Sequence, residues 1–462
     1  MDAVLGGFDD APEPAAERAE PAAAGSAPFE LGGSVELSGS FNYRRHESST
    51  GTDYFGLQRL RTRLNLELDA ELPQGWKLRL AGYGFADPAY ALNGRHEYTH
   101  DVRSRYEFDA DFLESWIQGR LTRALDVKLG RQIAIWGRSD TIRVLDVINP
   151  LDNREPGRVD IEDLRRPVGM LRSDYYLGRW SLSALLIPEI RTDDNPATGS
   201  DFSFDAAGVT LQETIPNDFS NWELAFAANG IFEGWDLSFH GAWLYDDRPH
   251  VVNSALPADQ IPVPGLSVPL GIRLAHGRQW MLGASGNHTL GSWLAKAELA
   301  YFGDTDFCDE FPRSDDPSPP PPAGPLLLPC RGEEKDRIDA MLGLEYYGIR
   351  DVSVALEVAN RRVLRFEDEL RNAFDFAQRN SEEIALRFTQ SFFRERLELT
   401  LLAYVLGWRA QDGAILRASA DYDLRDALVL SAGLLLFEAG DAVPLSGWGR
   451  NDRFFFGIKW SF

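Results

Sequence analysis

The chain has 462 residues, 44% of them hydrophobic and 26% charged, and its 71 acidic against 47 basic side chains give a net charge of -24. This excess of negative charge disfavours binding to nucleic acid or to anionic lipid. No stretch reaches the roughly 18 uncharged apolar residues that a transmembrane helix requires, since even 427–437 is interrupted by Ser431 and Gly433. With only two cysteines, a disulfide scaffold and a zinc ribbon are both excluded.

Residues 1–28 form a tract of their own. The chain opens Met1-Asp2-Ala3 without a basic and then apolar leader, so the protein is either cytoplasmic or already processed, with Met1 added for expression. The rest of the sequence favours the second, an exported protein whose signal peptide has been removed. Residues 11–27 are rich in Ala, Pro and Glu, so we expect a flexible N-terminal segment. The more apolar stretch 4–10 is either a frayed terminus or a contact for a periplasmic partner or the barrel mouth described below.

From residue 29 onward, apolar and polar side chains alternate with a period of two. The alternation is clear over 29–43, 60–72, 235–245, 338–346 and 428–436. Such segments are about ten to twelve residues long, the length that a strand tilted at about 45° needs to cross a bilayer. The pattern therefore predicts long membrane-crossing strands with one apolar and one polar face.

Short and long connections alternate between these segments. About eight short turns lie at 73–75, 122–124, 178–179, 232–234, 291–292, 348–351, 393–395 and 424–426. About nine longer polar loops lie near 44–57, 87–106, 137–166, 188–220, 246–277, 303–335, 361–381, 406–413 and 438–450. Tryptophans follow four of the short turns, at Trp76, Trp180, Trp235 and Trp293, where an interfacial aromatic girdle would lie.

These observations predict an all-β fold, a transmembrane antiparallel up-and-down β-barrel of about 18 strands, within about 16–20. Residues 29–462 form the barrel, with short periplasmic turns, long extracellular loops and both termini on the short-turn side. A soluble propeller or β-helix is the alternative, but the chain lacks the repeated motif that either fold would show.

The turn at 73–75 also predicts a register. Pairing Leu72 with Trp76 sets Glu71 opposite Lys77 and Asp69 opposite Arg79, all on the polar face.

The last strand, 453–462, ends on Phe462 after an alternating aromatic run. It resembles the closing strand of Gram-negative outer-membrane proteins, whose terminal Phe is read by the barrel-assembly machinery. The resemblance implies an integral outer-membrane location and an assembly signal at Phe462.

A second resemblance lies in Gly130 to Pro167. The residues that carry it are Leu129-Gly130-Arg131-Gln132, Trp136-Gly137, Asp140, Asp146 to Pro150, Asp152 and Arg165-Arg166-Pro167. This stretch is similar to a porin-like outer-membrane family known as domain of unknown function number thirteen-oh-two. Members often accompany exporters of the resistance-nodulation-division (RND) type, which implies traffic of hydrophobic molecules and an exporter as partner.

The same stretch contains the third long loop, around 137–166. In trimeric porins, the third loop folds into the lumen. Its charged residues are candidates for a pore constriction: Arg138, Asp140, Arg143, Asp146, Asp152, Arg154 and Arg158. They could read a passing solute, form a salt-bridged plug, or belong to a loop outside the barrel.

Inward-facing charges of the strands are further lumen candidates. Arg59, Arg61 and Arg63 form a basic ladder above Glu67 and Asp69, which would either orient a dipolar solute or pair with their neighbours. The alternation of this strand places Arg131 on the same face as apolar residues, and a bulge near Gly130 would turn it into the lumen.

Cys308 and Cys330 bracket a proline-rich acidic loop, and an oxidising compartment favours a disulfide between them. We expect no cofactor and no metal centre, although the acidic loop could bind divalent cations that bridge lipopolysaccharide. No nucleophile motif surrounds His240, so no enzyme is predicted.

We therefore expect a transport barrel, a porin-like channel for small solutes among outer-membrane lipids and lipopolysaccharide. A portal for hydrophobic or lipid-like compounds working with an RND-type exporter, and a sheath around a partner protein, remain alternatives.

Overall fold

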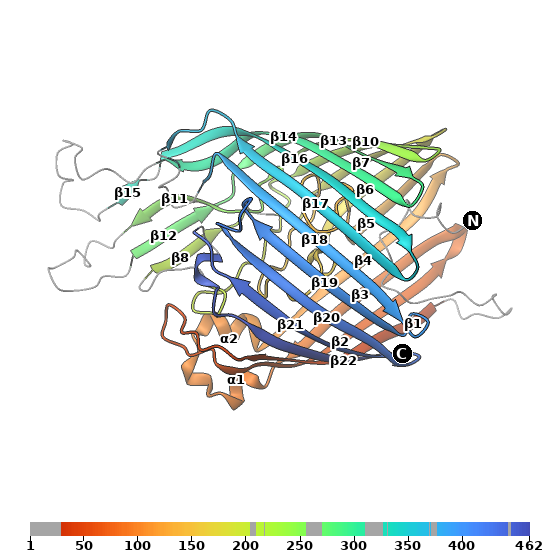
Figure 1. Ribbon diagram of the computed structural model, residues 1–462. Helices are drawn as coiled ribbons and strands as arrows, with labels where there is room; N and C mark the ends of the chain where they lie inside the picture. Colours follow the sequence, from red (N-terminus) through yellow and green to blue (C-terminus); the bar gives the residue numbers. More distant parts are fainter. Residues whose placement is uncertain are drawn as a thin grey trace.

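Eighteen strands form one closed antiparallel sheet in the computed structural model (Figure 1). The structure describes residues 29–203, 209–216, 218–255, 270–309, 327–329, 331–368, 370, 377–441 and 445–462. Each barrel strand pairs with the next one along the chain, and β1 closes the sheet against β22. The barrel strands are β1 (Phe29–Asn42), β2 (Gly56–Leu72), β3 (Trp76–Ala86), β4 (Phe108–Thr122), β5 (Leu125–Gln132), β6 (Val168–Leu177), β7 (Trp180–Ile187), β9 (Glu223–Phe232), β10 (Trp235–Tyr245), β13 (Arg278–Leu290), β14 (Trp293–Asp309), β16 (Arg331–Ile349), β17 (Val352–Val363), β18 (Asn380–Phe392), β19 (Leu397–Leu406), β20 (Gly413–Arg425), β21 (Leu428–Glu438) and β22 (Arg453–Ser461).

A second, four-stranded sheet and most of the helices belong to the long loops. The sheet has the order β15 (Leu327–Pro329), β11 (His250–Ala255), β12 (Leu270–Ala275) and β8 (Val209–Thr214), and β12 pairs with β8 in parallel. The helical segments are α1 (Ala89–Leu92), α2 (His100–Tyr106), α3 (Ile161–Leu164), η1 (Pro73–Gly75), η2 (Arg95–Glu97) and η5 (Leu445–Gly447). None of the helices in the described ranges is long and apolar enough to cross a membrane.

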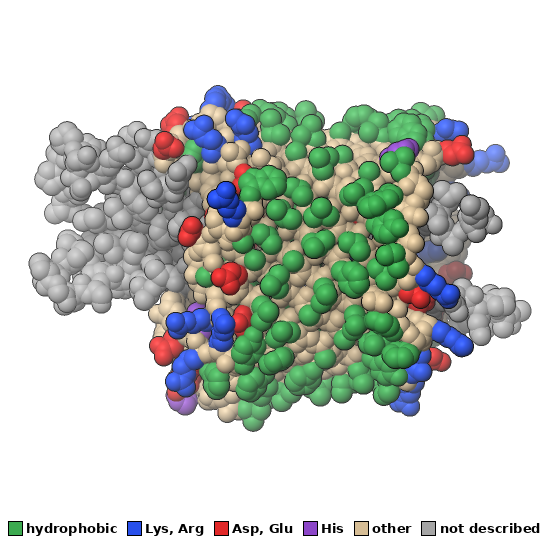
Figure 2. Space-filling model, in the orientation of Figure 1, with side chains coloured by type: hydrophobic (Ala, Val, Ile, Leu, Met, Phe, Trp, Pro, Cys, Tyr) green, Lys and Arg blue, Asp and Glu red, His purple; other side chains and the backbone are tan. Residues whose placement is uncertain are grey.

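The outer face of the barrel is an apolar band. Side chains such as Leu66, Phe239, Leu299 and Leu401 are exposed on it, whereas their neighbours along each strand point into the barrel. Figure 2 shows this band between two rims where charged side chains gather. A closed barrel pairs the backbone groups between strands, which is what a segment in lipid requires. The predicted transmembrane barrel of about 18 strands is thus confirmed.

The predicted alternation of turns and loops matches the observed connections, and β1 begins and β22 ends at the short-turn end (Figure 1). The predicted hairpin register is confirmed, since Leu72 pairs with Trp76 and Asp69 with Arg79. Nε of Arg79 donates to Asp69 at 2.9 Å.

One predicted loop, 303–335, is shorter in the structure. The ladder between β14 and β16 continues to Asp309 and Arg331. A register shift between Phe302 and Thr305 lets the two strands pair again beyond the point where the predicted loop begins.

The barrel closes at the last residue of the chain. Nine pairs join β1 to β22, from Ser34 with Ser461 to Asn42 with Arg453. Beyond them, the amide of Phe462 donates to the carbonyl of Gly33 at 2.9 Å, and the Gly33 amide donates back at 3.0 Å. The terminal Phe is therefore part of the seam, while its role as an assembly signal stays a prediction.

Candidate constriction in the barrel lumen

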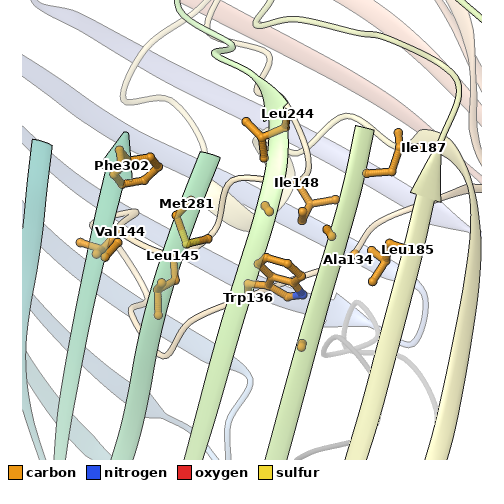
Figure 3. Close-up of a cluster of buried hydrophobic side chains, with 14 of the residues drawn as sticks. Ala134, Trp136, Val144, Leu145, Ile148, Leu185, Ile187, Leu244, Met281 and Phe302 are labelled. Atoms are coloured by element: carbon orange, nitrogen blue, oxygen red, sulfur yellow. The ribbon is translucent and has the colours of Figure 1, made fainter. Parts of the chain in front are cut away.

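The long loop between β5 and β6, residues 133–167, folds against the inner wall of the barrel. Its apolar side chains Ile142, Val144, Leu145 and Ile148 are buried, together with inward-facing residues of the wall (Figure 3). The wall residues of this lumen cluster include Leu185, Ile187, Leu244, Met281, Phe302 and Met341. Burying each such loop side chain stabilises the docked loop by about 1.5–3 kcal/mol.

Gly283 leaves room for the central side chain of this cluster. A β-carbon on Gly283 would lie 2.1 Å from Cδ2 of Leu145, so a larger residue there would force the Leu145 side chain to shift. Leu145 is fully buried as a result. The charges of this loop were the basis of its predicted role, and its apolar residues are the signal in the sequence that it also packs against the barrel wall.

Two glutamates of the wall hold the loop backbone. Glu357 on β17 accepts from the amides of Asp140 at 2.6 Å, Thr141 at 3.0 Å and Ile142 at 2.9 Å. Its side chain lies in the buried interior, so these bonds form away from bulk water. One carboxylate thus satisfies three consecutive backbone donors.

Glu298 on β14 holds the loop backbone on both sides of that segment. It accepts from the amides of Arg138, Ser139 at 2.8 Å and Leu145 at 3.2 Å. Neither glutamate was predicted, because inward positions of a barrel strand are commonly polar and nothing in the sequence marks those that contact a loop.

Side-chain ion pairs add to these backbone contacts on the same side of the lumen. Lys296 lies between Asp140, at 2.8 Å, and Glu345. Arg138 reaches β10, where its Nη2 lies 2.8 Å from Asp236.

The far part of the loop is held by other strands. Glu155 pairs with Arg59 and, at 3.2 Å, with Arg61, both on β2. Burial by itself would raise the pKa of the Glu155 carboxyl, but Arg59, Arg61 and Arg158 outweigh it and hold that pKa well below its ordinary value. This contact is therefore an ionised cluster.

Asp160 is the next anchor. It pairs with Arg387 of β18 at 2.9 Å and with Arg417 of β20. Both arginines point inward from the wall, so the loop is also held from this side of the barrel.

Arg154 is surrounded by carboxylates. It lies 3.0 Å from Asp109, 2.7 Å from Asp152 and 3.4 Å from Asp194. Although burial opposes it, these carboxylates raise the pKa of Arg154 above its ordinary value. Arg154 therefore ties the loop to β4 and to the following long loop.

The remaining predicted residues of the loop pair within it. Asp146 lies 3.2 Å from Arg143 and 2.9 Å from Arg165, and Arg158 lies 2.8 Å from Glu155. All seven predicted constriction residues thus form ion pairs inside the barrel, in separate clusters, and a constricting role for them stays a prediction.

The predicted lumen residues also have partners. Arg63 donates to Asn65 at 2.8 Å and stacks on Tyr83 at 4.0 Å, while Glu67 and Asp69 pair with Arg79. Arg59 and Arg61 of this set form ion pairs with the loop, through Glu155.

Arg131 pairs with Asp111 at 2.7 Å and with Glu189. The predicted bulge near Gly130 is wrong, because β5 pairs with β6 in unbroken register through this residue. Gly130 instead has a φ of 130°, which glycine adopts without an inserted residue.

Cys308 is buried and disulfide-bonded, whereas Cys330 lies outside the described residues. Most of the acidic loop predicted to bind cations, and the segment 1–28, also lie outside them.

A second loop segment crosses the lumen end without having been predicted. Phe202 packs against Phe437 and Trp448, with ring centroids 5.5 Å and 5.3 Å away. Asp201 pairs with Arg453 at 2.9 Å, so this segment joins the loop after β7 to β21 and β22.

Comparison with solved structures shows the same fold. The chain is similar to OccAB1 of Acinetobacter baumannii, with 10% identity, 94% of this chain and 96% of that chain covered, and a TM-score of 0.52. It also matches OccK2 (OpdF) of Pseudomonas aeruginosa, solved with glucuronate, at 11% identity, 94% and 98% coverage and a TM-score of 0.49. No curated protein sequence matches the chain.

The model of one protein family matches residues 13–417, which include the stretch Gly130 to Pro167 on which the resemblance rested. That family is described as a protein of unknown function, DUF1302. The match covers most of the chain, and the protein is therefore a member of the DUF1302 family.

Proposed function

We propose that the protein is an outer-membrane channel for small solutes, without catalytic activity, in which residues 133–167 constrict the lumen. The observation that carries this proposal is that opposite walls hold the loop. Glu155 is bound by β2 and the Arg138–Leu145 turn by β14. Around the barrel, β2 and β14 are separated by β3, β4, β5, β6, β7, β9, β10 and β13 on one side and by β16 to β22 with β1 on the other. The loop therefore spans the lumen.

The character of the inner wall supports polar solutes. Towards the short turns, the inward side chains include Asp69, Arg79, Lys128, Arg172 and Asp174, and they pair with one another or with neighbours. A wall of this kind holds water, so a solute entering from the periplasmic side meets an aqueous vestibule that ends at the loop.

Single-channel conductance in planar bilayers tests the proposal. We expect small, well-defined conductance steps for the full chain, and larger steps for a variant shortened between Asp140 and Asp163. Heat-modifiable migration on gels verifies that both barrels assemble. An assembled barrel that conducts in neither form would contradict a channel.

A portal for hydrophobic or lipid-like compounds, working with an RND-type exporter, is the second candidate. The observation that favours it is the apolar strip under the loop, with Leu185, Leu244, Met281 and Phe302 on the inner wall. If the loop moves aside, this strip offers an apolar path. Barrels that conduct no ions but take up a fluorescent hydrophobic amine when the loop is shortened would favour the portal.

A sheath around a partner protein has less support, because loop segments already occupy the lumen that the partner would need. The partners that we propose are outer-membrane lipid and lipopolysaccharide around the apolar band, and the barrel-assembly machinery at Phe462.

A further inference from the structure

A small cavity lies between the loop and the wall, next to the lumen cluster. Its volume is about 70 Å³. The loop contributes Trp136 and Arg138, and the wall contributes Arg172 of β6, Asn229 of β9 and His240 of β10. A site of this volume holds several waters or one small organic molecule.

The position of the cavity follows from the strand registers. Ser238 pairs with Asn229 across β10 and β9, and His240 follows two residues later on the same inward face. Leu244, in the lumen cluster, lies four residues beyond His240 on the same face of β10, closer to the long loops. The cavity is therefore at the middle of the barrel, on the short-turn side of the lumen cluster.

His240 is 6% exposed, and its Nδ1 atom has no hydrogen-bond partner among the described residues. Its ring lies 4.8 Å from the ring of Trp136, which holds the imidazole in place. A buried polar nitrogen without a partner costs free energy, and a ligand or water in the cavity would remove that cost.

The two arginines present donors to the same space. Arg172 donates from Nε to Asp174 at 3.1 Å, and its terminal nitrogens make no hydrogen bond to any described residue. Arg138 is oriented by Asp236 and by Ser238, each 2.8 Å from its Nη2. The aspartates that balance these charges do not line the cavity, so its lining has guanidinium, amide and imidazole groups and no carboxylate.

We propose that this cavity, which we name the Trp136 pocket, is a binding subsite for a small monocarboxylate. The inference rests on the proposed channel function, since it makes the pocket a point where the solute pauses beside the constriction. A guanidinium with free terminal nitrogens matches the two oxygens of a carboxylate, and the Asn229 amide and the His240 nitrogen supply further polar contacts. Trp136 covers the small apolar end of the molecule.

Calorimetric titration of the full chain in detergent tests the subsite, with sodium acetate as the probe. Sodium chloride at equal ionic strength and ethylammonium chloride serve as the anion and size controls. We expect saturable binding of acetate alone. Arg172→Gln should weaken it by about tenfold or more, because a charge-assisted hydrogen bond is lost.

Asn229→Leu is the second variant, because it leaves every ion pair intact and places apolar bulk in the pocket. Lys459→Gln is the matched control, since it removes a lumen-facing positive charge from β22, far from the pocket, and should leave acetate affinity unchanged. Equal binding of acetate and ethylammonium, or unchanged affinity in both pocket variants, would overturn the proposal.

The two proposals fail separately. An assembled barrel that conducts ions but does not bind acetate keeps the channel and loses the subsite. A barrel that binds acetate with the expected variant pattern but conducts in no form keeps the subsite and loses the channel.

Discussion

Replacing Glu357 by glutamine should release the loop from the wall without unfolding the barrel. The carboxylate accepts three backbone amides, through one oxygen from Asp140 and through the other from Thr141 and Ile142. Glutamine keeps one acceptor oxygen and turns the other into a donor, which repels the amide facing it. With hydrogen bonds to a charged group at about 1.5–3 kcal/mol each, loss of the bond to that amide, together with loss of the charge that strengthens the other two bonds, costs about 3 kcal/mol.

A change of this size shifts the equilibrium between docked and undocked loop by about a hundredfold. The strand ladder of β17 with β16 and β18 does not involve the side chain, so the barrel itself should persist. Amide hydrogen exchange of residues 138–145, followed by mass spectrometry, should accelerate by about the same factor. Conductance measured in parallel should rise or become noisy as the loop leaves the lumen.

Glu398→Gln is the control, because it makes the same substitution elsewhere on the barrel, at an exposed residue of β19. The reasoning would be refuted if Glu357→Gln formed a heat-modifiable barrel whose loop exchanged at the rate of the unmodified protein. Exchange that accelerated equally in both variants would indicate a general loosening of the barrel instead.

Three further predictions concern other parts of the molecule. Replacing Arg143 and Arg154 with Ala should shift ion selectivity towards cations, measured as reversal potential, because the carboxylates around them lose their counter-charges; an unchanged potential would place the loop outside the permeation path. Deleting Phe462 should lower the yield of assembled barrel in the outer membrane, since two seam hydrogen bonds go with it. His276 is desolvated, but its bonds to Glu213 and to a backbone carbonyl outweigh this and raise its pKa. Its contribution to stability is therefore complete below the ordinary histidine pKa and is lost as pH rises through the raised value, so thermal unfolding should show this pH dependence and His276→Phe should abolish it.

The barrel could be predicted because its signal is local. A strand with lipid on one side and water on the other must alternate, and this alternation is present in residues 29–43 as clearly as in 428–436. The turn at 73–75 even determined its register, since only one pairing sets Asp69 opposite Arg79.

The loop is a mixed case. Its place as the third long loop and its charged residues were evident from the sequence, and the structure places these residues in several ion-paired clusters, most of which include wall partners. Which wall residues take part was not evident, because Glu298 and Glu357 look like any other inward polar residue. The buried Leu145 and the space left by Gly283 show that the contact is also one of shape.

The four-stranded sheet of the long loops had no local signal at all. Its parallel pair β8 and β12 joins segments about 60 residues apart, and the crossing of Phe202 to Phe437 and Trp448 joins segments more than 200 residues apart. The sequence by itself therefore determined the barrel, because lipid on one face of each strand and water on the other impose the alternation of apolar and polar residues. Only the tertiary structure decided how the lumen is filled, because the side chains there contact partners that are distant in the chain.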